Sequence, residues 1–130
     1  MSDTTGTTSG GNRMNPEIRE QWAQDLESGD YPQSSGYLRT ERGFCCLGVL
    51  CEQAVRAGVI SRFGLSYGTS PEDPEKNATF LPRKVMNWAG LDHADPYVDR
   101  RDNNDTCSLS ELNDMETSFG VIARLIREQL

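Results

Sequence analysis

The strongest constraint on what this chain can fold into is an apolar stripe that starts at Leu47. Apolar residues stand at positions 47, 50, 51, 54 and 55, the spacing of a helix that buries one face. Gly58 follows where such a helix would stop, because glycine readily takes the left-handed conformation found beyond helix ends. The pattern predicts a core helix from about Leu47 to Gly58, around which the rest of the chain packs.

Caps and periodic apolar residues indicate further helices. Asn15 before Pro16 is a helix-start signature, an N-cap followed by proline at the first helical position. Ser108 and Glu111 have the spacing of a capping box. The predicted helices and their apolar faces are Pro16 to about Ser28 (Ile18, Trp22, Leu26), Leu81 to Gly90 (Leu81, Val85, Trp88, Ala89), a short helix after Ser108 (Leu109, Leu112), and a last helix capped by Thr117 (Phe119, Ile122, Ala123, Ile126).

The segments between these helices predict little β-structure. Residues 37–40 have the pattern of a short strand, residues 41–43 that of a turn, and residues 44–46 that of a return strand or a helix entry. Residues 66–77 hold glycine and prolines among acids, which is typical of an exposed loop, and residues 96–98 are a further candidate strand. We therefore expect a mostly helical α+β fold, with four to five short helices around one core and a small β-hairpin before the second helix.

The chain has 130 residues, which is enough for one domain. Residues 1–13 hold serine, threonine and glycine with no core-forming residue after Met1, so we expect a flexible tail. Met14 is also a candidate alternative start of translation. The predicted organisation is a tail over 1–13 and a single α+β domain over 14–130.

Charge and hydropathy exclude several classes of protein. The net charge is −7, which disfavours non-specific binding to nucleic acid, because phosphate recognition needs a basic face. No apolar run approaches the length of a membrane span, and the first residues lack the pattern of a secretory signal. We therefore expect no membrane partner and a cytoplasmic location. Thiols stay reduced there, so the four cysteines are not expected to form disulfides.

Several short blocks resemble a known group of sequences. The blocks are Phe44-Cys45-Cys46-Leu47-Gly48-Val49-Leu50-Cys51, Leu81-Pro82, Trp88-Ala89-Gly90-Leu91, Leu112-Asn113-Asp114 and the spacing of Phe119, Ile122, Ala123 and Ile126. In these blocks the chain resembles a family of short uncharacterised proteins encoded by tailed phages of actinobacteria, over residues 14–130. The resemblance implies an infected bacterial cytoplasm as the setting. It implies no reaction, so it transfers no catalytic residue.

The cysteines are the first candidates for chemistry. Cys45 and Cys46 are adjacent and Cys51 lies five residues on, which is not the paired spacing of a zinc site. A thiol at a helix N-terminus has a lowered pKa, so Cys45 or Cys46 could be a nucleophile with His93, the only histidine, as its base. The alternative is that these thiols are small packing groups in the core, which is common for free cysteine. We favour packing, and we expect no metal and no other cofactor.

Two polar segments each allow a functional and a structural interpretation. A calcium loop beginning at Asp102 would use Asn104, Thr106, Ser108 and Ser110, but Cys107 and Asn113 replace the defining glycine and glutamate. We therefore expect a solvated loop. Asn113 and Asp114 could hydrogen-bond a ligand, although a turn in which both bond their own backbone is favoured.

The last candidate is a set of cationic and aromatic residues. Guanidinium groups recognise phosphate and aromatic rings stack on bases, so a local positive pocket in an acidic protein would suit a small anion. A shared pocket for Arg39, Arg42 and Lys84 would favour that ligand, and their separation would favour a protein partner. The predicted ligand-binding residues are Tyr37, Arg39, Arg42, Arg83, Lys84, Asn113 and Asp114.

Because the catalytic patterns fail on spacing or lack a partner residue, we expect a binding protein rather than an enzyme. The hypothesis is a phage accessory protein that acts in the host cytoplasm, either by sequestering a small anionic signalling nucleotide as a counter-defence or by blocking a host protein. A cysteine-dependent enzyme and a minor structural component of the virion are the alternatives. A homo-oligomer is left open.

Overall fold

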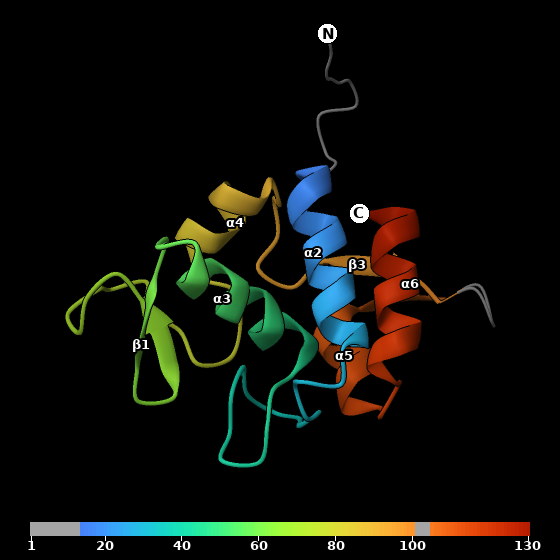
Figure 1. Ribbon diagram of the computed structural model, residues 1–130, viewed down its shortest axis with the longest axis horizontal. Coiled ribbons are helices and arrows are strands. Elements are labelled where there is room, and N and C mark those ends of the chain that lie inside the picture. The colour runs from blue at the N-terminus through green and yellow to red at the C-terminus, as the bar shows by residue number, and fades with distance from the viewer. Residues whose placement is uncertain (1–13, 101–104) are drawn as a thin grey trace, which may run out of the picture.

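The computed structural model describes residues 14–100 and 105–130, so the predicted tail lies outside the described residues. The fold is α+β and mostly helical, as expected, and the chain order is shown in Figure 1. The helices are α2 (Pro16–Glu27), α3 (Cys46–Arg56), α4 (Arg83–Ala89), α5 (Leu109–Asp114) and α6 (Phe119–Gln129), and the strands are β1 (Ser61–Phe63), β2 (Ser66–Gly68), β3 (Tyr97–Asp99) and β4 (Thr106–Ser108).

Helix α3 is the centre of the core, as the apolar stripe predicted. Every residue from Cys46 to Ala54 is buried, so the helix is covered on all sides rather than along one face. Gly58 follows the helix end with a φ of 78°, a conformation that glycine takes without strain. Trp22 of α2 is fully buried and donates its indole N–H to the carbonyl of Cys46 at 2.9 Å. Trp88, which was expected in the core, is only half-buried.

Gly48 explains how the chain before α3 can lie against the helix. A Cβ atom built at Gly48 would meet the carbonyl oxygen of Leu38 at 1.8 Å. Leu38 is itself fully buried, and its carbonyl accepts the N–H of Cys45 at 3.2 Å. The segment before α3 therefore crosses the helix at backbone contact, and only a residue without a side chain fits at the crossing.

Helices α2 and α6 lie side by side on the right of Figure 1. Asn15 caps α2 by accepting the N–H groups of Glu17 and Ile18, and Pro16 is the first helical residue, as predicted. Arg127 of α6 donates to Glu20 and Glu27 of α2, which joins the two helices on their solvent side. The last helix is capped by Ser118, so the prediction of Thr117 was wrong by one residue.

The hairpin of β1 and β2 is the main element that the sequence analysis missed. Residues 66–77 were predicted to be an exposed loop, but Tyr67 in β2 is fully buried and exchanges two backbone hydrogen bonds with Asn77. The hydroxyl of Tyr67 donates to Glu52 of α3 at 2.5 Å, and the guanidinium of Arg62 also pairs with that buried carboxylate. A buried polar cluster therefore anchors the hairpin to the core helix.

The other predicted strands are present in modified form. The hairpin expected before the second helix is reduced to a single antiparallel bridge between Arg39 and Phe44, closed by hydrogen bonds between Thr40 and Gly43. The candidate strand at 96–98 is β3, which pairs with β4 so that Val98 faces Cys107. The capping box predicted at Ser108 and Glu111 is formed at the start of α5.

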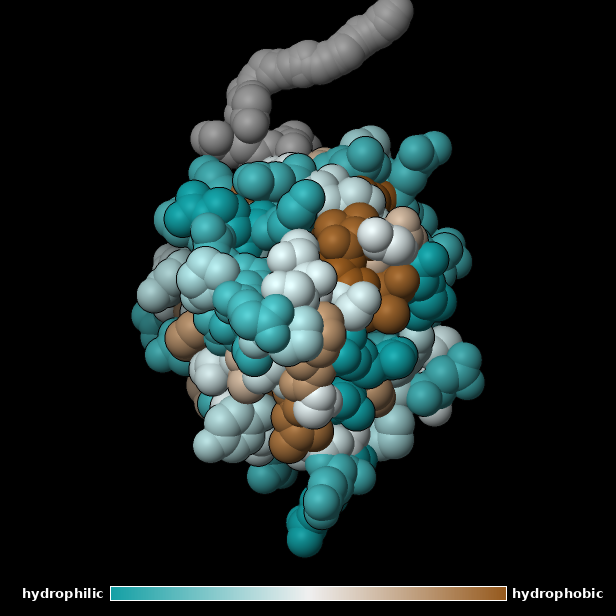
Figure 2. Space-filling model, turned by 90° about the vertical axis from the view of Figure 1, so that its left-hand side faces the viewer, coloured by the Kyte–Doolittle hydropathy of each residue, from teal (hydrophilic) through white to brown (hydrophobic). Residues whose placement is uncertain are grey.

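The face that carries the β1–β2 hairpin and α4 is shown in Figure 2, where hydrophobic side chains form separate groups among hydrophilic ones. Large apolar side chains exposed elsewhere in the described chain are also scattered, for example Tyr37 and Tyr97. None of the described helices has the length and apolar character needed to cross a bilayer.

Candidate functional site

The thiols lie inside the core. All four cysteines are free and buried. Burial raises the pKa of Cys45 to about 11 and holds the pKa values of Cys46 and Cys51 well above the ordinary thiol range. The lowered pKa that the nucleophile alternative requires is absent, because loss of hydration outweighs the hydrogen bonds that the backbone offers a thiolate. These thiols stay protonated at neutral pH.

The expected base for a nucleophilic cysteine is not in place. His93 is exposed, and its Nε2 atom lies 3.8 Å from the carboxylate of Asp92. The Sγ atom of Cys46 donates instead to the carbonyl of Leu109 at 3.4 Å. Within residues 14–100 and 105–130, no hydrogen bond joins a cysteine to the imidazole.

Two positions of the candidate calcium loop, Asp102 and Asn104, lie outside the described residues. Two of its other positions are occupied by structural bonds. Ser108 caps α5, and Ser110 donates both its N–H and its hydroxyl to Asp95. Across the described part of the chain, no group of three or more histidine, cysteine, aspartate or glutamate side chains is placed to hold a metal ion.

Asn113 has a different role from the turn residue that was favoured. It is 1% exposed, and its side chain bonds distant residues instead of its own backbone. Its Oδ1 atom accepts the N–H of Cys46 at 3.2 Å and the amide of Gln33 at 3.1 Å, and its Nδ2 donates to the carbonyl of Ser34 at 2.7 Å. Because Cys45 makes no capping bond with its own side chain, Asn113 supplies the cap of α3 from α5.

These bonds hold the segment of residues 33–36 against the end of α5. Asp114 adds a further bond, because its carboxylate accepts the N–H of Gly36 at 3.2 Å. Gln33 is fixed as well, since its amide nitrogen also donates to the carbonyl of Thr117 at 2.8 Å. These hydrogen bonds therefore fasten the segment to the end of the helix.

A polar pocket of about 450 Å³ lies at this junction. We call it the α5 pocket; it is lined by Gln33, Ser34, Ser35, Arg42, Asn113 and Glu116. Arg42 and Glu116 are exposed, and in the described part of the chain their side chains have no hydrogen-bond or ion-pair partner, so two charges of opposite sign are available to a bound group.

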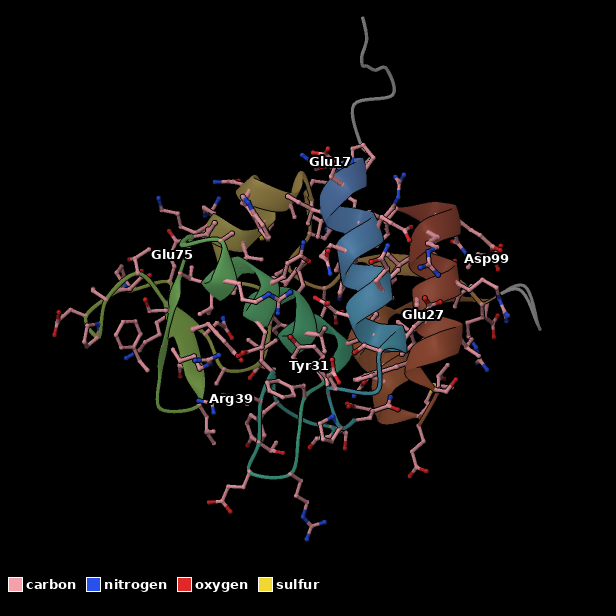
Figure 3. The ribbon with its side chains drawn as sticks, in the orientation of Figure 1. Glu17, Glu27, Tyr31, Arg39, Glu75 and Asp99 are labelled. Carbon is pink, nitrogen blue, oxygen red and sulfur yellow. The ribbon has the colours of Figure 1, made fainter. Side chains whose placement is uncertain are left out.

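The remaining predicted residues do not join this pocket. Arg83 and Lys84 line a separate hollow of about 270 Å³, the α4 pocket, with Thr69, Asp73, Glu75, Pro82 and Asn87. Arg39 donates to the carbonyl of Gly64 beside the β1–β2 hairpin. Figure 3 places Arg39 at the lower end of that hairpin and Glu75, the partner of Arg83 at 2.9 Å, at the upper left. The expected single positive pocket is not formed. Tyr37 is exposed, one residue beyond the bond between Gly36 and Asp114.

Arg42 and Asn113 were both predicted to bind a ligand, and the structure brings these two together. The other lining residues, Gln33, Ser34, Ser35 and Glu116, were not predicted. Serine and glutamine in a turn-rich segment carry no pattern that separates a pocket from a solvated loop. For Glu116, the available signal was its position two residues after Asp114, where a helix end was already expected.

By fold and site, the molecule is a small α+β domain with a buried cysteine-containing core helix and a polar surface pocket. Residues 14–130 match the family described as a domain of unknown function (DUF8296), and the chain belongs to that family. No curated protein and no solved structure matches the chain.

Proposed function

We propose that this chain is a non-enzymatic binding protein that a tailed phage produces in the cytoplasm of its host, where it blocks a host protein. The observation that carries the proposal is a pair of exposed charges of opposite sign, Arg42 and Glu116, which line the α5 pocket without a partner in the described part of the chain. Arg42 favours an acidic group in the occupant and Glu116 favours a basic one. A polypeptide segment supplies both groups, whereas a polyphosphate would face the Glu116 carboxylate.

Two further observations support binding over catalysis. The thiols of α3 are protonated and buried, which removes support from a cysteine-dependent enzyme. The floor of the α5 pocket is also held in place by the hydrogen bonds of Asn113 and Gln33 before any partner arrives. A preformed floor reduces the conformational entropy that is lost on binding.

Site-specific photo-crosslinking in the host cytoplasm tests the proposal. A photoreactive amino acid at Ser35 lies on the rim of the pocket, and one at Arg124 lies on the exposed face of α6 as a control. We expect one host protein to be crosslinked from position 35, no adduct from position 124, and loss of the adduct in the Arg42→Glu background. No adduct, or the same adduct in all three proteins, would reject the proposal. The protein should also be absent from purified virions.

A second candidate, sequestration of a small anionic nucleotide, is favoured by the α4 pocket. Within the described residues Lys84 has no ion-pair partner, and Asn87 adds a neutral donor. The two carboxylates of this pocket are already engaged, since Glu75 pairs with Arg83 and Asp73 accepts from Thr69. Calorimetric titration of cyclic nucleotides and ADP-ribose against wild type and Lys84→Ala tests this candidate, which requires binding that the variant weakens.

A further inference from the structure

Glu116 stands in an unusual backbone conformation at the edge of the α5 pocket. Its φ is 65°, and among the described residues it is the only non-glycine residue with a positive φ. The N–H of Glu116 bonds the carbonyl of Asn113 at 3.0 Å, and the N–H of Thr117 bonds that of Leu112 at 3.1 Å. This pair of bonds is a Schellman motif, in which the position of Glu116 is normally glycine.

A glutamate at that position destabilises the helix end, because its Cβ crowds the backbone when φ is positive. Residues held in such conformations cluster at binding sites, where the surrounding structure maintains them. The helix end itself would be satisfied by glycine. The side chain of Glu116 therefore needs a reason outside the fold, and it lines the pocket.

The hydrogen-bonding groups around Glu116 define which kind of side chain could bind at this edge of the pocket. The amide nitrogen of Gln33 is used by Asn113 and Thr117, which leaves its carbonyl oxygen without a partner in the described structure. A carboxylate and a fixed amide oxygen are both acceptors. An arginine guanidinium, with five N–H donors in one plane, can satisfy both at once, whereas a lysine ammonium acts as a point charge.

We infer that Glu116 and Gln33 bind an arginine side chain of the partner protein, and that Arg42 binds an acidic residue next to that arginine. The inference rests on the proposed function and names the segment that would enter the site. In this arrangement Glu116 is the residue that sets specificity, because it selects a cationic side chain over a neutral one. The recognition element is then an Asp-Arg or Glu-Arg pair on an exposed loop.

Nuclear magnetic resonance titration of the full chain with capped dipeptides tests this inference. The probes are acetyl-Asp-Arg-amide, acetyl-Asp-Lys-amide and acetyl-Asp-Leu-amide, followed through the side-chain amide signals of Gln33. We expect the first probe to bind best and the leucine probe to bind about tenfold more weakly, since one charge-assisted interaction is lost. Glu116→Gln should weaken the arginine probe by a similar factor.

The matched control is Glu17→Gln, which removes an exposed carboxylate at the start of α2, outside the pocket, and should leave binding unchanged. Equal binding of the arginine and leucine probes, or an unaffected Glu116→Gln variant, would overturn the inference. If neither the arginine probe nor the lysine probe shifts the Gln33 signals while the Ser35 crosslink still depends on Arg42, the arginine assignment fails and the proposed function stands. The proposed function fails separately if position 35 gives no crosslink in the otherwise wild-type chain, or if the crosslink persists in the Arg42→Glu background.

Discussion

At the scale of single residues, Gly48 is where the sequence block around the cysteines has its clearest physical reason. The block looks like a set of reactive thiols, but its glycine is the residue that permits the close contact between α3 and Leu38. The neighbouring cysteines are small enough to fill the core around that crossing. The block therefore encodes packing.

The Gly48→Ala substitution tests this account. The new Cβ would lie 1.8 Å from a backbone oxygen, so the helix and the crossing segment must separate. We expect a loss of about 3 kcal/mol or more in the free energy of unfolding, at the upper end of the range for overpacking. The control is Gly120→Ala in α6, where nothing lies within 4 Å of the added Cβ, and a gain of up to about 1 kcal/mol is expected. Urea unfolding measures both, and equal effects would contradict the close crossing.

At the scale of elements, the buried thiols of helix α3 and of its N-cap, Cys45, make the free energy of unfolding depend on pH in the alkaline range. The pKa of Cys45 is about 11 in the folded protein against 9.0 for the unperturbed thiol, and those of Cys46 and Cys51 are raised as well. A raised pKa gives stability that is fully present below the unfolded pKa and is lost as the pH approaches the folded one. The free energy of unfolding should therefore fall between pH 9 and 11.

Cys45→Ala separates the contribution of one thiol, since alanine does not ionise. Its stability should decline less steeply over that range, by on the order of 2 kcal/mol in total, because each unit of pKa shift is worth about 1.4 kcal/mol. The Tyr67 phenol, whose pKa burial also raises, acts in the same direction in both proteins. Denaturant unfolding at a series of pH values gives the comparison. The thiol would be shown to be exposed if the free energies of unfolding of the two proteins fell in parallel as the pH rises. Rapid labelling of Cys45 by a thiol reagent at pH 7 would show the same.

The attachment of the β1–β2 hairpin to α3 depends on Arg62. Removing this guanidinium in Arg62→Ala would leave Glu52, which is 6% exposed, with the Tyr67 hydroxyl as its remaining hydrogen-bond donor among the described residues. A buried carboxylate that loses its cationic partner is strongly destabilising. We expect a loss of about 2 kcal/mol, because Arg62 is itself half-exposed. Arg83→Ala breaks the exposed pair with Glu75 and should change stability by less than about 1 kcal/mol. Similar losses in the two variants would argue against a buried anchor.

At the scale of the whole molecule, the first described residue closes the domain. Met14 is buried, its N–H bonds the carbonyl of Leu130 at 3.0 Å, and the family match starts at the same residue. We expect a chain that starts at Met14 to unfold at the same urea concentration as the full chain. A lower midpoint would mean that residues before Met14 contribute to the fold.

The elements that the sequence predicted are those whose signals are local. The stripe after Leu47, the Asn15 cap and the Ser108 capping box each lie within one turn or one helix, and each is present in the structure. The features it missed depend on contacts between distant segments. Tyr67 lies among prolines and acids yet is buried and donates a hydrogen bond to Glu52. Asn113 looks like a turn residue yet caps a helix 67 positions away.

The same reasoning applies to the candidate site. Arg42 and Asn113 were selected for their chemistry, but nothing in the sequence shows that they share a pocket or that Arg83 and Lys84 lie elsewhere. Whether cationic residues form one surface depends on how helices and loops are arranged in three dimensions. Their separation is the reason that a protein partner is preferred here to a small anion.

The central claim is that Glu116 is kept for binding and not for the fold, and one variant tests it most directly. Glu116→Gly places the preferred residue at the left-handed end of α5, so the free energy of unfolding in urea should rise by about 1 kcal/mol. A rise would show that the glutamate is held against the preference of the backbone. A fall would contradict the account, because it would mean that the Glu116 side chain stabilises the folded protein.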